Sequence, residues 1–145
     1  MEEFKNIFEG LDVAYGQHQS EGKRADGKQE GKSYIVKQVV VDELWTEHLN
    51  GNGPSLGIIP IRADNTVKWG CIDIDTYPID YRKIINNIRK LQLPLIPCRS
   101  KSGGLHLFLF FKNPVSAKLV REKLREVASG LGYSSVEVFP KQSTI

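Results

Sequence analysis

Residues 105–111 form an almost uninterrupted apolar run in which His106 is the one polar residue. The run is much shorter than the roughly 20 residues of a membrane-spanning helix, and its length is typical of a strand that is buried on both faces. The chain has 145 residues, which is enough for one domain with a single hydrophobic core. We therefore expect one folded domain over residues 1–145, built around a covered β-sheet.

The spacing of the other apolar residues predicts the remaining elements. Residues 56–61 and 67–74 are apolar runs on either side of a five-residue polar segment, which favours a β-hairpin. Asp42 as an N-cap, with Gly51 and Gly53 as stop signals, predicts a short helix over 42–49. Apolar residues at helical spacing predict helices over 79–91 and from Pro114 to Gly130 or Gly132. Short strands are expected over 34–41, 94–98 and 136–139. This order predicts an α+β fold in which a mixed β-sheet carries helices on one face and follows an irregular N-terminal region.

The segment from residue 17 to residue 32 differs in composition from the rest of the chain. It contains three glycines, several charged residues and no large apolar side chain, so it cannot contribute to a core. We expect a flexible, basic and glycine-rich surface loop here. The alternative is a flap that contacts a polyanion.

The composition also excludes several classes of protein. Two widely spaced cysteines, Cys71 and Cys98, and three histidines cannot build a disulfide framework or a zinc module. The first residues are charged and no apolar run could cross a membrane, so we expect a cytoplasmic protein with reduced thiols. The net charge of +3 is a weak field, and only clustered cations would attract a polyanion.

Two carboxylates alternate with isoleucines at the end of the strand expected over 67–74. A period of two places Asp73 and Asp75 on one face, and Ile72 and Ile74 on the other face toward the core. Two close carboxylates repel, and a divalent cation between them is a common remedy. Oxygen ligands of this kind suit Mg²⁺ or Mn²⁺. A solvated strand end, a loop cap or a salt-bridge partner remains the alternative interpretation.

A basic, glycine-rich turn precedes the apolar run. It consists of Arg99, Ser100, Lys101, Ser102, Gly103 and Gly104. Glycines let backbone N–H groups approach an anion, and the two cations add charge at the same place, so the turn is a candidate phosphate-binding site. A flexible turn that is merely basic is the alternative. His106 follows directly, either as a ligand contact or as a satisfied core histidine.

A third acidic residue, Glu137, lies between two valines in the last expected strand; alone, it would more often be a solvated glutamate. Taken together, the acidic pair in residues 71–75, the SerGlyGlyLeuHis segment in residues 102–106 and the segment from Val136 to Gln142 resemble the three motifs of the archaeo-eukaryotic primase (primase-polymerase) superfamily. The resemblance is closest to the primase domains of phages and of TOTE conflict systems. Weaker similarities, at residues 12–15, 48–51 and 56–60, extend it over most of the chain.

The resemblance implies an RRM-like catalytic sheet and a DNA primase or primase-polymerase, a nucleotidyltransferase (EC 2.7.7 type) that acts in DNA replication. It implies that Asp73, Asp75 and Glu137 hold two Mg²⁺ or Mn²⁺ ions and that His106 contacts the phosphate of the incoming nucleotide. Residues 99–104 would cradle the triphosphate, and Lys141 belongs to the same nucleotide-binding set. NTP or dNTP and a single-stranded DNA template are the implied substrates, a helicase or further replication subunit is an expected partner, and phage or mobile-element DNA in a host cytoplasm is the expected setting.

Two features differ from many relatives. The third acidic residue is Glu rather than Asp, and the chain ends eight residues after it, so we expect a domain truncated at its C-terminus.

Two other functions compete with this interpretation. A non-catalytic, RRM-like nucleic-acid or nucleotide-binding subunit that needs a partner would depend on its cations and not on its carboxylates, and its affinity would fall steeply with salt. Its candidate cations are Arg99, Lys101, Lys118, Arg121 and Lys123. A metal nuclease or rolling-circle nicking domain is disfavoured, because a nicking domain needs a His-x-His pair and His106 stands alone between two leucines.

Overall fold

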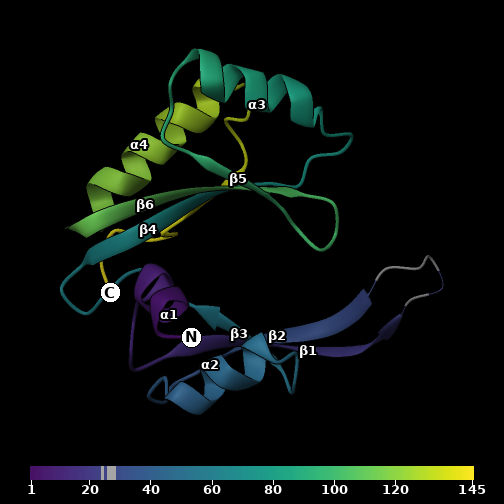
Figure 1. Cartoon of the computed structure of the whole chain (residues 1–145), viewed down its shortest axis with the longest axis vertical. Helices are drawn as coiled ribbons and strands as arrows, with labels where there is room; N and C mark the ends of the chain where they lie inside the picture. Colours follow the sequence, from purple (N-terminus) through teal and green to yellow (C-terminus); the bar gives the residue numbers. More distant parts are fainter. Residues whose placement is uncertain (24, 26–28) are drawn as a thin grey trace.

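The computed structural model describes residues 1–145 except residue 24 and residues 26–28. The elements, in chain order, are α1 (Glu2–Phe8), β1 (Tyr15–Lys23), β2 (Gln29–Val36), α2 (Asp42–Leu49), β3 (Ser55–Ile58), β4 (Thr66–Ile74), α3 (Tyr81–Lys90), β5 (Ile96–Arg99), β6 (Leu105–Ser116), α4 (Ala117–Gly130) and β7 (Glu137–Phe139). They form a three-stranded sheet of order β2-β1-β3 and a four-stranded sheet of order β5-β6-β4-β7 (Figure 1). The predicted α+β class is confirmed. None of the helices in this described part of the chain is both long and apolar enough to span a membrane.

The hydrophobic core lies between the four-stranded sheet and helices α3 and α4. Both helices cover the same face of this sheet (Figure 1). Ile72, Ile74 and Leu107 project from β4 and β6 to this face and have no exposed surface. The core side chains of the helices are Ile84, Ile88, Val120, Leu124 and Ala128. From Gly70 to Ile74, alternation with period two therefore directs every second residue of β4 to the core and turns the residues between them to the other face. A register shift between Val67 and Trp69 changes the phase, so that Val67 is also in the core.

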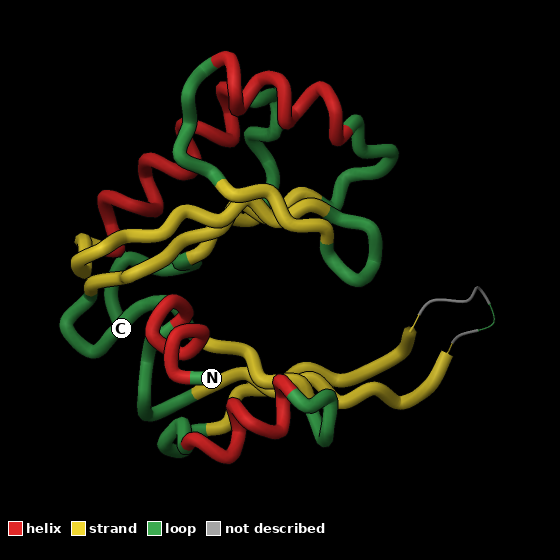
Figure 2. Tube along the Cα trace, in the orientation of Figure 1, coloured by secondary structure: helices red, strands yellow, loops and turns green. Residues whose placement is uncertain are grey.

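The other face of the four-stranded sheet is partly covered by α1, which lies between the two sheets (Figure 2). The ring of Phe8 packs edge-on against three aromatic rings of this face, with centroids 5.3–5.6 Å away, namely those of Trp69, Phe108 and Phe110. The expectation that both faces of residues 105–111 are buried is therefore wrong. Leu105 and Leu107 are buried against the helices, whereas His106 and Phe108 on the opposite face keep some exposure.

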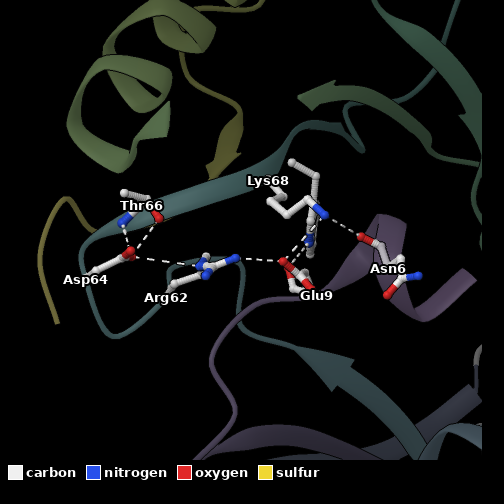
Figure 3. Close-up of polar contacts among 7 residues, drawn as sticks. Asn6, Glu9, Arg62, Asp64, Thr66 and Lys68 are labelled. Carbon is white, nitrogen blue, oxygen red and sulfur yellow. Dashed lines mark hydrogen bonds and ion pairs between the residues drawn. The ribbon is translucent and has the colours of Figure 1, made fainter. Parts of the chain in front are cut away.

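A polar network fixes the end of the α1 segment to the start of β4 (Figure 3). One carboxylate oxygen of Glu9 lies 2.6 Å from the guanidinium of Arg62 and 3.5 Å from Nζ of Lys68. Asp64 accepts hydrogen bonds from the backbone N–H and the hydroxyl of Thr66, at 3.1 and 2.6 Å. These groups are exposed or half-exposed, so solvent screens each contact and its contribution to stability is small. Together they fix the direction in which the chain enters β4.

Three predictions of local structure are wrong. Residues 56–61 and 67–74 do not form a hairpin, because β3 pairs with β1 whereas β4 pairs with β6 and β7. Pro114 does not begin a helix; it lies near the end of β6, and α4 begins at Ala117. The N-terminal region is not irregular, since it contains α1 and the three-stranded sheet.

The expected loop over residues 17–32 is largely a pair of strands. Tyr15–Lys23 and Gln29–Val36 pair in antiparallel register, with Gln19 opposite Lys32. The backbone hydrogen bonds between β1 and β2 explain how strands form in a segment without large apolar residues, because these bonds satisfy N–H and C=O groups without a hydrophobic core. Arg24 and Lys28, which contribute to the predicted basic character of the loop, lie outside the described residues.

Candidate active site

The three charged residues that the sequence selects from three different strands lie in one row across the four-stranded sheet. In the register, Asp73 of β4 is directly opposite His106 of β6 on one side and Glu137 of β7 on the other. Residues directly opposite each other project to the same face of a sheet. All three therefore lie on the face away from α3 and α4, where the side chains of Asp73 and His106 are 27% and 37% exposed.

Asp73 and His106 contact each other directly. Nε2 of His106 lies 3.3 Å from Oδ1 of Asp73. The hydrogen bond to Asp73 raises the pKa of His106 above its ordinary value, against the opposing effect of partial burial. The contact therefore favours the protonated form of His106, next to the carboxylate of Asp73.

Glu137 has its own cationic partner. Nζ of Lys141 lies 3.0 Å from Oε1 of Glu137 and 5.0 Å from the centre of the Phe139 ring. Like charges directly opposite each other in a sheet are destabilising, and Asp73 and Glu137 are such a pair. His106 on one side and Lys141 on the other offset this repulsion, so the sheet tolerates two adjacent carboxylates.

Asp75 lies just beyond the end of β4 and is exposed. The alternation that the sequence predicted thus holds for Asp73, whereas Asp75 leaves the strand. Among the residues that the structure describes, no group of three or more His, Cys, Asp and Glu side chains is close enough to hold a metal ion. The fold places Asp73 and Glu137 opposite each other on one face, with Asp75 just beyond the strand, and within the described residues it does not gather the three carboxylates into a closed cluster.

The basic turn between β5 and β6 has a defined hydrogen-bond pattern. The N–H of Ser100 donates to the carbonyl of Gly104 at 2.9 Å, and the N–H of Gly103 donates to the carbonyl of Ser100 at 3.1 Å. The hydroxyl of Ser100 accepts from the N–H of Gly104 at 2.8 Å, and it lies 3.3 Å from the hydroxyl of Ser102. Gly103 has φ +84°, a backbone conformation that suits glycine. Hydrogen bonds within the turn therefore hold its backbone in a defined conformation.

The turn packs against the end of the acidic strand. A methyl group added at Gly104 would lie 3.0 Å from the carbonyl oxygen of Ile74 and 2.8 Å from the hydroxyl of Ser100, too close for either to remain in place. Asp75 directly follows Ile74, so the backbone of the phosphate-binding candidate and the backbone of the acidic pair are in contact. A ligand that carries phosphates and a divalent cation could meet both elements at once.

A comparison with protein families matches residues 12–145 to the archaeo-eukaryotic primase domain of TOTE conflict systems. The chain belongs to this family. No curated protein matches the chain closely enough to be reported as a relative. Helix α1 lies before the first matched residue, so the primase domain proper contains both sheets and the three helices α2, α3 and α4.

The donor set of this primase domain fits a hard divalent cation. Asp73 and Glu137 lie opposite each other near the end of β4, at one edge of the open sheet face, and Asp75 lies just beyond the end of β4; each is partly or fully exposed. Carboxylate oxygens are the ligands that Mg²⁺ and Mn²⁺ prefer. A cation at this edge would compete with His106 and Lys141 for the carboxylates and would take over the neutralisation that they provide.

Sequence reasoning missed two tyrosines of the primase domain that contact the turn. Tyr77 and Tyr81 follow the acidic pair, and their hydroxyls donate to the carbonyls of Ser102 and Gly103. Their one sequence signal is the presence of two aromatic residues within six positions of Asp75, in a segment that was expected only to enter a helix. The contact is long-range in sequence, so no local pattern predicts it.

Proposed function

We propose that this primase domain is a metal-dependent nucleotidyltransferase that extends a 3′-hydroxyl with an NTP or dNTP on a single-stranded DNA template. The observation that supports the proposal is the row of Asp73, His106 and Glu137 on an exposed sheet face, next to a basic turn that touches the same strand end. Membership of the primase family supports a nucleotide and nucleic-acid substrate.

The reaction forms one bond and breaks another. The 3′-oxygen bonds to the α-phosphorus, the bond from that phosphorus to the bridging oxygen of the β-phosphate breaks, pyrophosphate leaves, and the proton of the hydroxyl passes to solvent. Such a reaction depends mainly on positioning and on neutralisation of phosphate charge. Bound Mg²⁺ or Mn²⁺ would supply much of that neutralisation.

The residues of the chain have separate roles in the proposed reaction. Asp73, Asp75 and Glu137 hold the cations, and protonated His106 contacts a phosphate of the incoming nucleotide. The triphosphate lies on the turn formed by residues 99–104, where Arg99 and Lys101 contribute charge and the glycines admit a close backbone approach. Lys141, released from Glu137, would be available to the same nucleotide. We place this activity in the replication of phage or mobile-element DNA, in the host cytoplasm and with a helicase or other replication subunit as partner.

A primer-extension assay tests the proposal. Purified protein is incubated with Mg²⁺ or Mn²⁺, a labelled primer on a DNA template, and NTP or dNTP. We expect extension by the unaltered chain and loss of at least 100-fold in rate with Asp73→Asn, since carboxylates that position a reaction contribute several kcal/mol. Glu126→Gln is the matched control, because Glu126 is an exposed carboxylate on α4, a helix that covers the other face of the sheet.

The second candidate is a non-catalytic nucleotide or nucleic-acid binder. The observation in its favour is that Asp73 and Glu137 are already paired with His106 and Lys141, and that no three-ligand group is assembled among the described residues. This candidate predicts no extension with either metal, and binding that falls with salt and is unchanged by Asp73→Asn combined with Asp75→Asn. These two results together would refute the proposed nucleotidyltransferase activity.

A further inference from the structure

The segment that follows the acidic strand lies against the basic turn. Tyr77 and Tyr81 belong to this segment, two and six residues after Asp75. The hydroxyl of Tyr77 donates to the carbonyl of Ser102 at 3.3 Å, and the hydroxyl of Tyr81 donates to the carbonyl of Gly103. Two successive carbonyls of the turn are therefore held by two phenols from one neighbouring segment.

With these contacts, two peptide groups of the turn have hydrogen bonds at both their carbonyl and their N–H. In the peptide that joins Ser102 to Gly103, the carbonyl is bonded to Tyr77 and the N–H to the carbonyl of Ser100. In the peptide that joins Gly103 to Gly104, the carbonyl is bonded to Tyr81 and the N–H to the hydroxyl of Ser100. Each peptide group is held at both ends, so neither can rotate without the loss of a hydrogen bond.

The turn keeps other donors for a ligand. Within the described part of the chain, the N–H groups of Lys101 and Ser102 donate to no protein acceptor. Successive backbone N–H groups in a tight turn bind anions when the peptide planes are fixed, because the donors are then preorganised. The tyrosines hold the two peptides that follow these free donors.

Tyr81 also holds a cation of the site. The guanidinium of Arg99 lies over the Tyr81 ring, 5.7 Å from its centre. A methyl group added at Gly103 would lie 3.8 Å from Oη of Tyr81 and 3.9 Å from a guanidinium nitrogen of Arg99, so both groups border the turn. The ring face attracts the cation, and the hydroxyl holds the backbone. One side chain therefore couples the charge of Arg99 to the geometry of the turn.

We propose that Tyr77 and Tyr81 are positioning residues that hold the turn of residues 100–104 and Arg99 in the arrangement that receives the polyphosphate of a nucleoside triphosphate. The proposal rests on the proposed function and names the part of the nucleotide that this side of the site takes. It also links the two halves of the site, because the segment that carries the tyrosines begins at Asp75 and ends in α3.

The test removes only the hydroxyls. Affinity for a nucleoside triphosphate and for inorganic tripolyphosphate is measured calorimetrically for Tyr77→Phe, Tyr81→Phe and the double variant, together with KM and kcat in primer extension. Tyr133→Phe is the control, since Tyr133 is a partly buried tyrosine packed against the core after α4. Tyr81→Leu separates the ring from the hydroxyl, because it also removes the support of Arg99.

We expect Tyr81→Phe to weaken both ligands roughly fivefold, the factor that corresponds to one net hydrogen bond of about 1 kcal/mol, and the double variant to weaken them at least tenfold. KM for the nucleotide should rise by the same factors while kcat and oligonucleotide affinity change by less than about twofold. Tyr81→Leu should bind both ligands more weakly than Tyr81→Phe does, and Tyr133→Phe should bind them as tightly as the unaltered chain does. A purely structural role would lower the unfolding midpoint without this selective rise in KM.

Two outcomes overturn different claims. If Lys101→Ala weakens tripolyphosphate binding but the double tyrosine variant does not, the turn binds phosphate without the tyrosines and this inference is wrong, while the proposed function stands. If the unaltered chain binds neither triphosphate nor tripolyphosphate, the proposed site is wrong and the inference is overturned with it.

Discussion

Gly70 provides the sharpest test of how the core positions the site. It lies in β4 on the face that packs against α4, and a methyl group added there would be 2.7 Å from Cδ1 of Leu124, 2.9 Å from the carbonyl oxygen of Phe139 and 3.0 Å from Cγ1 of Val120. Ordinary contact begins at 3.4 Å. The Leu124 methyl group can move, but the carbonyl of Phe139 belongs to β7, which is paired with β4 opposite Cys71.

We expect Gly70→Ala to destabilise the fold by about 1–3 kcal/mol, which is the usual cost of overpacking a filled core. With a urea dependence of about 2 kcal/mol per molar, the midpoint of unfolding should fall by roughly 1 M. The measurement is urea denaturation followed by circular dichroism. Because β7 carries Glu137, the displaced strand should also reduce the affinity for Mn²⁺.

Gly130→Ala is the matched control. Gly130 is the last residue of α4, has no atom within 4 Å of an added methyl group, and has no positive φ. Alanine favours a helix over glycine by up to about 1 kcal/mol, so this variant should be as stable as the unaltered chain or more stable. If Gly70→Ala unfolds at the same urea concentration as the unaltered chain, the described contact of β4 with α4 and β7 is wrong.

Three further predictions concern parts of the fold outside the row of charges. Phe8→Ala should lower the free energy of unfolding by about 2 kcal/mol, because the half-buried ring loses apolar contact, three aromatic pairings with the sheet and one with Phe4; an unchanged urea midpoint would show that α1 does not pack on the sheet. The hydroxyl and N–H of Thr66 lower the pKa of Asp64 below its ordinary 3.8, so this carboxylate contributes stability above that value and loses it as the pH falls through the lowered pKa. Asp64→Asn should therefore reduce the urea midpoint near neutral pH but not in strong acid, and equal reductions at both would contradict this sign. Cys98 is exposed and Cys71 is buried, so a thiol reagent should label one cysteine in the folded protein and two in urea, with Cys98→Ser removing the rapid label.

Local periodicity was sufficient for much of the fold. The apolar spacing predicted helices over 79–91 and from Pro114 to Gly130 or Gly132, which agree with α3 and α4 to within a few residues, since each helix buries one face on the sheet. The period of two in 67–74 gave a strand with Ile72 and Ile74 in the core, and the structure confirms this. Patterns of this kind succeed because the buried face of an element is decided within the element itself.

Strand pairing could not be predicted in the same way. The segment between Ile58 and Thr66 is compatible with a hairpin, but β3 pairs with β1, which lies 40 residues earlier in the chain. Residues 17–32 lack large apolar side chains, and the described strands in this range, in β1 and β2, are held by backbone hydrogen bonds that composition does not predict. Both errors arise because pairing depends on contacts that are distant in the sequence.

In the candidate site, too, local sequence patterns predicted some features, and contacts distant in the sequence determined the others. The spacing of Asp73 and the motif around His106 selected the residues, but the register that sets them opposite each other comes from the alignment of β4 with β6. The two tyrosine contacts to the turn are tertiary contacts that no periodicity predicts. The ion pair of Glu137 with Lys141 joins residues four positions apart, but it forms across the end of a strand and not within a helix. Sequence thus identified the chemistry of the groups, and the fold determined their partners.

A crystal soaked with Mn²⁺ and a nonhydrolysable nucleoside triphosphate tests the central claim most directly. We expect anomalous scattering from Mn²⁺ at the carboxylates of Asp73, Asp75 and Glu137, with His106 and Lys141 moved from their present partners and the polyphosphate on the N–H groups of Lys101 and Ser102. Mn²⁺ bound elsewhere, or a nucleotide bound away from the turn while Asp73 keeps its contact with His106, would contradict it.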